Sequence, residues 1–339
     1  MGTSDGALGT PPLPHHLQLE VTSACNLSCA MCLVSYRPAV NRAEGAMPFE
    51  LFRRLVDGTP GLTRLTLQGL GEPLLQPHLP EMVRYAKERG IEVGFNSNAM
   101  LLSRERADRF VALGLDWLHV SLDGATARTY EGIRSGGNFE RVARNLRGLR
   151  DAKRAAGTDK PWVRVVFVAM RRNVHELPDL VRLLGEWEVN ELHVQGLSHT
   201  FDDTDPAGAY AGIREFARSE TLEHAPPDEV ADVFARARAQ AERSGVALRL
   251  PAPDAAPPVR EPGRPGCTWP WDAAYVTASG TVQPCCMVMG DDRVSMGNLA
   301  DADLAEIWTG EAYRQFRSAL LGDTPPAVCA GCSLYRATF

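Results

Sequence analysis

Short apolar runs alternate with amphipathic helical patterns through the first two thirds of the chain. The expected strands are His16–Thr22, Arg64–Leu70, Glu92–Asn96, Trp117–Leu122, Val163–Met170 and Glu191–Gln195. The expected helices between them are Phe49–Asp57, Leu79–Arg89, Arg104–Leu113, Phe139–Lys153 and Leu177–Trp187. This order predicts βα units on a parallel sheet, and six such units are too few to close an eight-stranded barrel. Polar site residues are expected just after each strand.

The pattern changes near residue 200. Residues 201–262 hold an acidic loop, a helical stretch over Asp228–Ser244 and a proline-rich run, PAPDAAPPVREPGRP, typical of an extended linker. Farther on, AYVTASGTVQP predicts a hairpin and GNLADADLAEIW a helix. We therefore expect an α/β protein with a flexible tail at 1–14, a partial (β/α)6 barrel at 15–200, a helical extension and linker at 201–262, and a small cysteine-rich module at 263–339.

The charge balance narrows the classes of partner. Acidic residues outnumber basic ones, 42 to 36, and no run of like charges stands out. This argues against a nucleic-acid or polybasic membrane-binding protein and favours a small molecule or a short peptide as partner. The N-terminal residues have no signal-peptide pattern and no stretch of apolar residues is long enough to span a membrane, so we expect a cytoplasmic protein. In that reducing compartment, eight cysteines favour metal ligands or catalytic thiols over disulfides.

The first cysteine group has a distinctive spacing. The string ACNLSCAMC places Cys25, Cys29 and Cys32 as C-x3-C-x2-C on the loop that leaves the first expected strand. Three thiolates can hold a [4Fe–4S] cluster by three irons and leave the fourth open for chemistry. The alternatives are a three-cysteine zinc site and buried thiols without a ligand role.

This spacing and placement resemble the radical S-adenosylmethionine (SAM) superfamily. The resemblance implies that the open iron binds the amino and carboxylate groups of SAM. It further implies that one electron from an external donor, such as flavodoxin or ferredoxin, leads to cleavage of SAM and a 5′-deoxyadenosyl radical.

Other segments resemble SAM-binding elements of that superfamily. In QGLGEPL the match is carried by Gly71 and Glu72, although Leu70 stands where many relatives have another glycine. After the next two strands come FNSNAM and SLDG, and Met31 is placed to lie on the adenine. The other candidate contacts to SAM or substrate are Asn96, Asn98, Ser121 and Asp123. Their alternative roles are helix capping, turn formation and, for the methionine, simple packing.

The second cysteine group lies in the C-terminal module. The expected hairpin, the helix and a closing C-x2-C motif together resemble the twitch or SPASM modules that hold auxiliary clusters in radical SAM enzymes. The resemblance implies one further [4Fe–4S] cluster with the ligands Cys267, Cys285, Cys329 and Cys332. A structural zinc site with four cysteine ligands is the alternative. The spare thiol is Cys286, unless it takes the ligand role of Cys285.

The chain is similar to the radical SAM dehydrogenases and epimerases of aminoglycoside pathways, 2-deoxy-scyllo-inosamine dehydrogenase among them. This similarity implies oxidation of a secondary alcohol on a small aminocyclitol or aminosugar, with the auxiliary cluster as electron acceptor. One alternative is an epimerase in which the Cys286 thiol returns a hydrogen atom. The others are a ribosomal-peptide modifying enzyme, disfavoured because Cys25 lies so near the first residue, and a non-enzymatic metal-binding scaffold.

No general base is identified by the sequence. Five residues near strand ends or the module junction are candidates, and all have the alternative of a surface or ion-pair role. They are Arg171, His199, Asp202, Asp203 and Arg249.

Overall fold

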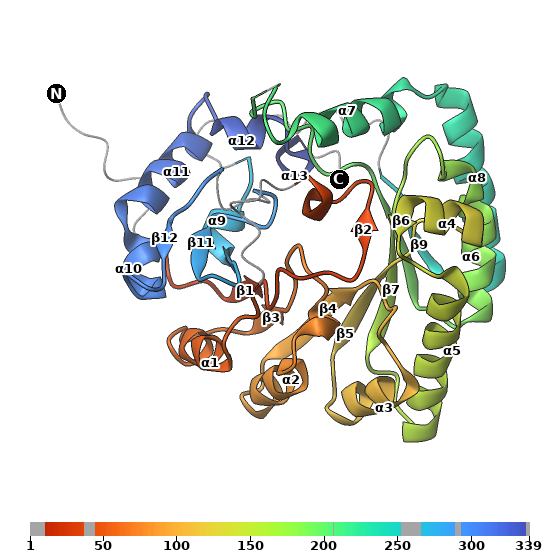
Figure 1. Cartoon of the computed structure of the whole chain (residues 1–339), viewed down its shortest axis with the longest axis horizontal. Helices are drawn as coiled ribbons and strands as arrows, with labels where there is room; N and C mark the ends of the chain where they lie inside the picture. Colours follow the sequence, from red (N-terminus) through yellow and green to blue (C-terminus); the bar gives the residue numbers. More distant parts are fainter. Residues whose placement is uncertain (1–10, 37–44, 206, 252–265, 289–292, 337–339) are drawn as a thin grey trace.

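A computed structural model of the chain describes residues 11–36, 45–205, 207–251, 266–288 and 293–336. Its main feature is an open, curved parallel sheet with helices on its outer side (Figure 1). All six expected strands are present and pair in parallel in the order β1-β3-β4-β5-β7-β8. Their bounds are β1 (His16–Leu19), β3 (Arg64–Thr66), β4 (Glu92–Ser97), β5 (Trp117–Ser121), β7 (Trp162–Val168) and β8 (Glu191–Gln195). The predicted partial barrel is confirmed.

The helices of the barrel follow the expected pattern, because each buries one apolar stripe against the sheet. The expected helices are α1 (Phe49–Asp57), α2 (Leu79–Glu88), α3 (Arg104–Ala112), α5 (Phe139–Ala156) and α6 (Leu177–Glu186). One further helix, α4 (Ala127–Ile133), was not expected; the Thr126 side chain caps it. The short 3-10 helices are η1 (Leu33–Ser35), η3 (Pro73–Leu75), η4 (Val174–Glu176) and η5 (Leu222–His224).

The sheet extends beyond the six strands on both sides. At one edge β9 (Ala247–Arg249) pairs with β8, although this strand was not expected in the helical extension. At the other edge the predicted hairpin joins the same sheet, because β10 (Ala273–Val276) pairs in parallel with β1. The strands β11 (Thr281–Gln283) and β12 (Gly297–Asn298) follow antiparallel. The cysteine-rich region is therefore continuous with the barrel sheet, where the sequence predicted a separate small module.

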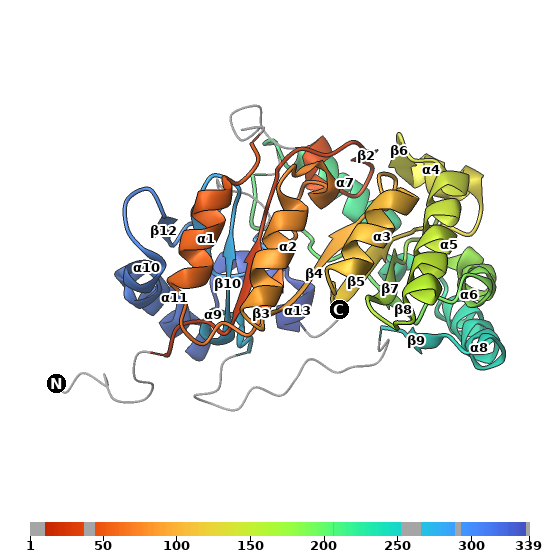
Figure 2. The ribbon, with the colours of Figure 1, turned by 90° about the horizontal axis from the view of Figure 1, so that it is seen from below.

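The remaining helices are α7 (Ala211–Glu220), α8 (Pro227–Ser244), α9 (Trp269–Asp272), α10 (Leu304–Thr309), α11 (Glu311–Leu321), α12 (Ala327–Ala330) and α13 (Ser333–Arg336). Of these helices, α8 lies at the β9 end of the sheet, and α9, α10 and α11 lie at the end formed by β10 and β12 (Figure 2). The expected tail and the proline-rich linker lie largely outside the described residues, although Pro12 accepts a hydrogen bond from the Trp308 indole. In the described part of the chain, none of the helices has the length and apolarity needed to cross a membrane.

Two histidines on the inner face of the sheet make stability depend on pH. Burial lowers the pKa of His16 to about 4 and that of His119 to about 3, and nearby arginines add to both shifts. Below the usual histidine pKa of about 6.5, the unfolded chain therefore binds protons that the folded chain does not. We expect the free energy of unfolding to fall by about 1.4 kcal/mol per pH unit for each histidine as the pH drops from about 6.5 to about 4.

The measurement is urea denaturation of the wild type and of His119→Gln between neutral and mildly acidic pH. The variant should lose about 1.4 kcal/mol per pH unit less than the wild type, because the contribution of His119 is gone. Replacement of the exposed His224 by Gln serves as the control. Equal pH dependence in His119→Gln and wild type would contradict the assignment.

Candidate active site

A cavity of about 230 Å³ lies at the carboxyl ends of the parallel strands. The loop after β1 forms one wall, the loops after β3, β4 and β5 form the floor, and the segment from the end of β8 to α7 closes the far side. The carboxyl ends of parallel strands are where such folds bind ligands. The cavity therefore lies where the sequence placed the site.

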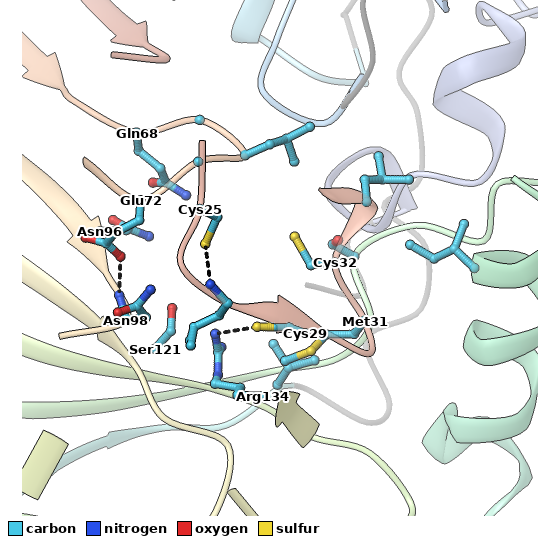
Figure 3. Close-up of a pocket in the computed structure, with 18 of the residues that line it drawn as sticks. Cys25, Cys29, Met31, Cys32, Gln68, Glu72, Asn96, Asn98, Ser121 and Arg134 are labelled. Atoms are coloured by element: carbon cyan, nitrogen blue, oxygen red, sulfur yellow. Dashed lines mark hydrogen bonds between the residues drawn. The ribbon is translucent and has the colours of Figure 1, made fainter. Parts of the chain in front are cut away.

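The three cysteines of the first group line this cavity. The two-residue strand β2 (Ser28–Cys29) holds the middle of their loop by pairing with β6 (Arg134–Ser135). The amide of Leu27 donates to Cys25 Sγ at 3.5 Å, and Arg134 Nη1 donates to Cys29 Sγ at 3.6 Å. The sulfur atoms of Cys25, Cys29 and Cys32 face a common space (Figure 3).

The donor set fits an iron–sulfur cluster. The loop directs three thiols at one cavity, so a four-iron cluster held by them would keep one iron without a ligand from these cysteines. Burial raises the pKa of Cys32 to about 11, so cluster binding here must displace thiol protons. Across the residues that the structure describes, no three His, Cys, Asp or Glu side chains are close enough to hold a single metal ion. A four-iron cluster is larger than one ion and needs more widely spaced ligands.

The glycine-containing loop after β3 packs directly on the cysteine loop. A Cβ atom on Gly71 would stand 2.1 Å from the carbonyl oxygen of Thr22, so no side chain fits there. The next amide, of Glu72, donates to the carbonyl of Ala24 at 2.8 Å. Leu70, at the position that is glycine in many relatives, adds an apolar side chain to the cavity wall.

The Glu72 carboxylate is buried and fully engaged with the protein. It accepts hydrogen bonds from the Leu74 amide, the Ser97 hydroxyl and the Asn98 amide at 2.8–3.0 Å. Burial raises the pKa of Glu72, while these hydrogen bonds oppose the shift. The side chain thus ties the loop after β3 to the end of β4.

The candidate polar contacts divide into two sets. Asn96 and Ser121 line the cavity, and Asn96 Oδ1 is buried without a hydrogen-bond partner among the described residues. Such an orphaned acceptor fits a donor group of a bound SAM molecule. Asn98 also lines the cavity, but its side chain bonds to Asn26 and to the Met100 amide. Met31 lies among the lining residues, and its contact with the adenine stays a prediction.

Asp123 lies behind the cavity, and the structure does not place it among the lining residues. One oxygen accepts from Arg134 Nε at 2.6 Å and the other from the Val168 amide at 2.7 Å. Because Arg134 also donates to Cys29 Sγ, the aspartate orients the arginine that contacts the cysteine loop. Asp123 was expected to contact SAM or substrate directly, but in the structure its carboxylate supports Arg134.

Several lining residues were not foreseen from the sequence. Gln68 and Arg134 point into the cavity (Figure 3). An apolar wall comes from the segment after β8 and from α7. It consists of Leu197, Phe201, Ile213, Phe216 and Ala217. The apolar spacing of Ile213, Phe216 and Ala217 is a helical signal within α7, although the acidic loop before it obscured the pattern.

In the second cysteine group, Cys285 and Cys286 follow β11, Cys329 lies in α12, and Cys332 lies at the turn between α12 and α13. Burial raises the pKa of Cys286 to about 12, and the neighbouring Cys332 and Cys267 add to the shift. The pKa of Cys285 is raised for the same reason, burial first and then Cys286, Cys267 and Cys332. Both members of the adjacent pair therefore lie near Cys267 and Cys332. None of these cysteines is among the residues that line the cavity.

The closing C-x2-C turn is bound to the rim of the cavity. His199 forms an isolated antiparallel bridge with Cys332. The Thr200 amide donates to the Gly331 carbonyl at 3.2 Å, and Ser333 Oγ donates to the Ser198 carbonyl at 3.0 Å. Since Ser198 and His199 line the cavity, the closing turn of the second cysteine group directly contacts residues that line the site.

His199 is fully engaged in this junction. Its Nδ1 accepts from the Phe201 amide at 2.7 Å, which leaves Nε2 to donate to the Val328 carbonyl at 2.9 Å. Because Nδ1 accepts a hydrogen bond, it carries no proton and the ring is neutral; burial also lowers the pKa of His199. Because both ring nitrogens are used, His199 has no lone pair left to act as a base. Asp203, another candidate base, is paired with Arg293 at 2.6 Å.

Comparisons with known proteins agree with this geometry. Residues 19–194 match the family model described as the radical SAM superfamily, and residues 267–333 match the SPASM model, an iron–sulfur cluster-binding domain. The chain is 26% identical to the tungsten-containing aldehyde ferredoxin oxidoreductase cofactor-modifying protein of Pyrococcus furiosus, over 94% of this chain and 87% of that protein. It is 28% identical to the PqqA peptide cyclase of Rhodopseudomonas palustris, over 94% and 80%.

A solved structure shares the fold. The crystal structure of Streptococcus suis SuiB bound to S-adenosylmethionine superimposes with a TM-score of 0.70 at 15% sequence identity, covering 96% of this chain and 72% of SuiB. The first family match spans more than half of the chain and includes the cysteine loop, the glycine loop and most of the six core strands. The chain belongs to the radical SAM superfamily, whose enzymes use SAM and a [4Fe–4S] cluster, and it carries a C-terminal SPASM region for auxiliary iron–sulfur binding.

Proposed function

We propose that this protein is an oxidative radical SAM enzyme that acts on a substrate presenting an apolar side chain, with a peptide as the substrate class that fits best. Cys25, Cys29 and Cys32 hold the cluster that binds SAM. The auxiliary cluster is held by Cys267, Cys285, Cys329 and Cys332. When bound, these groups supply a 5′-deoxyadenosyl radical that removes a hydrogen atom from the substrate, and an acceptor for the electron that the substrate then loses.

One observation carries the oxidative assignment: the closing C-x2-C turn is hydrogen-bonded to the rim of the cavity at Ser198 and Thr200. A cluster held by this turn lies beside the substrate space and not on a remote part of the surface. Four cysteine ligands leave no open iron, which suits electron transfer better than binding of substrate. His199 and Ser333 keep the turn and the rim in register.

The lining of the cavity supports an apolar substrate. The apolar wall lines the cavity, and two further lining residues, Leu33 and Leu70, belong to or pack against the same apolar cluster as Phe201 and Ile213. Among the described lining residues, each acid, arginine or histidine is already bonded within the protein: Glu72, Arg134 and His199. Within the described part of the lining, no carboxylate is left to pair with the ammonium group of an aminocyclitol. The expected aminosugar substrate is therefore less well supported than an uncharged one.

Oxidation is also favoured over epimerisation. An epimerase needs a hydrogen donor that faces the substrate radical, and Cys286 was the candidate. Cys286 lies with the other thiols of its group and does not line the cavity. We therefore assign it a packing role beside the auxiliary cluster.

Peptide substrates are supported by a relative. The PqqA peptide cyclase, which aligns with nearly the whole chain, is named for action on a peptide. A peptide side chain such as Val, Leu or Tyr is an apolar group that the wall of Phe201, Ile213 and Phe216 can hold. Dehydrogenation of an apolar secondary alcohol is the second candidate, since it uses the same loss of a hydrogen atom, a proton and an electron.

The experiment compares substrates in deuterated water under anaerobic conditions. The reconstituted protein is given SAM, dithionite and either 2-deoxy-scyllo-inosamine or peptides with Val, Leu or Tyr side chains, and 5′-deoxyadenosine and product mass are measured. We expect a peptide to raise 5′-deoxyadenosine above the substrate-free level and to lose a pair of hydrogen atoms. Stimulation by the aminocyclitol alone would overturn the substrate class. Product of otherwise unchanged mass that gains deuterium on carbon would replace oxidation by epimerisation.

A further inference from the structure

A row of arginines runs along the outer face of α5. Arg141, Arg144, Arg147 and Arg150 follow one another at intervals of three residues, so each is a neighbour of the next on the helix surface. Arg141, Arg144 and Arg147 are all exposed. In a chain with a net charge of −6, this row is a local concentration of positive charge. None of these four arginines lines the cavity, so the proposed reaction does not use them.

These arginines line a hollow of about 750 Å³ between α5 and the start of α3. Arg104 and Ser103 form its other side, and Met100 and Asn145 form its floor. Asp151 pairs with Arg150 and Asp108 with Arg104. Within the described part of the chain, Arg141, Arg144 and Arg147 make no ion pair. We call this surface, lined by Arg104, Arg141, Arg144, Arg147 and Arg150, the arginine hollow.

Two short routes join the arginine hollow to the first cysteine loop. On one route, Met100 of the floor lies two residues after Asn98, whose side chain donates to Asn26, the neighbour of Cys25, at 3.0 Å. On the other, Met100 Sδ accepts from the Asn138 amide at the start of α5. The segment before Asn138 contains Arg134, which contacts Cys29 Sγ.

The floor itself is held in place by side-chain hydrogen bonds to the backbone. Asn145 of α5 donates to the carbonyls of Ala99 and Met100 at 2.7 and 3.3 Å. The hollow is thus a built surface, joined to the loop of Cys25 and Cys29 by these short routes and lying outside the cavity that holds substrate. A protein docked there leaves the cavity open, because the arginine hollow and the cavity share no lining residue.

We propose that the arginine hollow is the docking surface for an acidic one-electron carrier protein of the flavodoxin type. Each SAM cleavage consumes one electron from the first cluster, and the docked carrier supplies it and leaves oxidised by one electron. The positive surface matches the acidic face of such a carrier and speeds encounter by long-range attraction. This inference requires only that the first cluster be reduced, and it does not depend on the substrate proposed above.

The test reverses three charges and compares two reductants. Arg141, Arg144 and Arg147 are replaced together by Glu in the full chain, and 5′-deoxyadenosine formation is measured with reduced flavodoxin and its NADPH-dependent reductase, or with dithionite. A matched control replaces Arg236, Arg238 and Arg243 of α8 by Glu, which changes net charge equally on another face. Iron content and circular dichroism verify that each variant is loaded and folded.

We expect the flavodoxin-supported rate to fall by about tenfold or more in the α5 variant, and to lose most of its dependence on salt, because steering contributes factors of about 10 to 1,000 at low ionic strength. The dithionite-supported rate and the α8 variant should stay close to wild type. An unchanged flavodoxin rate, an equal loss in the α8 variant, or an equal loss with dithionite would each overturn the proposal. The proposal would also fail if the α5 variant kept its flavodoxin-supported rate but lost binding to DNA or RNA that the wild type shows. In that case the arginine hollow would be a nucleic-acid binding surface.

Discussion

Replacing Cys25, Cys29 and Cys32 together by Ala is expected to abolish formation of 5′-deoxyadenosine while leaving about half of the bound iron. The wild type, reconstituted anaerobically, should hold about eight irons in two cubane clusters, and the variant about four. All three thiols face one cavity and belong to one loop, so the variant removes every protein ligand of a single cluster. The loop is also held by the pairing of β2 and by the hydrogen bond from the Glu72 amide to the Ala24 carbonyl, contacts that do not use the sulfur atoms.

Iron analysis and chromatography of the SAM reaction check this result. Cys286→Ala is the matched control, since it removes a cysteine that has no ligand role in the proposal and should retain about eight irons. SAM cleavage by the triple variant would show that the cluster is held elsewhere. Loss of all iron would show that the two sites do not load independently.

Replacing Cys329 and Cys332 by Ala is expected to separate SAM cleavage from oxidation. The rim contacts of this turn use the backbone of Gly331 and Cys332 and the side chain of Ser333, so they survive the loss of both sulfur atoms. The SAM cavity should remain formed, and 5′-deoxyadenosine should still appear. Oxidised product should fall by about a hundredfold or more, because the substrate radical has lost its electron acceptor, and each tenfold corresponds to about 1.4 kcal/mol.

The measurement is the ratio of oxidised product to 5′-deoxyadenosine, after circular dichroism has shown that the variant is folded. Cys285→Ala should behave in the same way and Cys286→Ala should not, which also decides which member of the adjacent pair is a ligand. A double variant that forms product in the wild-type ratio with only the first cluster loaded would remove the proposed role of the second.

Local features of the sequence were sufficient for the barrel and for the first cysteine loop. Apolar periodicity identified the strands and five of the outer helices, and C-x3-C-x2-C placed three thiols on one loop. Strand ends were less accurate, because residues such as Val21 and Met170 stay buried beyond the last residue of the strand. Burial produces the apolar signal whether or not a residue pairs in the sheet.

Only the tertiary structure decided which residues from distant segments contact one another. Asp123 comes directly after β5 and so qualified as a site residue, but Arg134 and the Val168 amide, both remote in sequence, draw its carboxylate away from the cavity. His199 qualified as a candidate base by its place after β8, but its two ring nitrogens are bonded to Phe201 and Val328. Spacing along the chain predicts which residues share a loop or a helix face, since those distances are fixed by local geometry. It does not predict that β10 pairs with β1 or that Gly331 meets Thr200, because such contacts depend on how the whole chain packs.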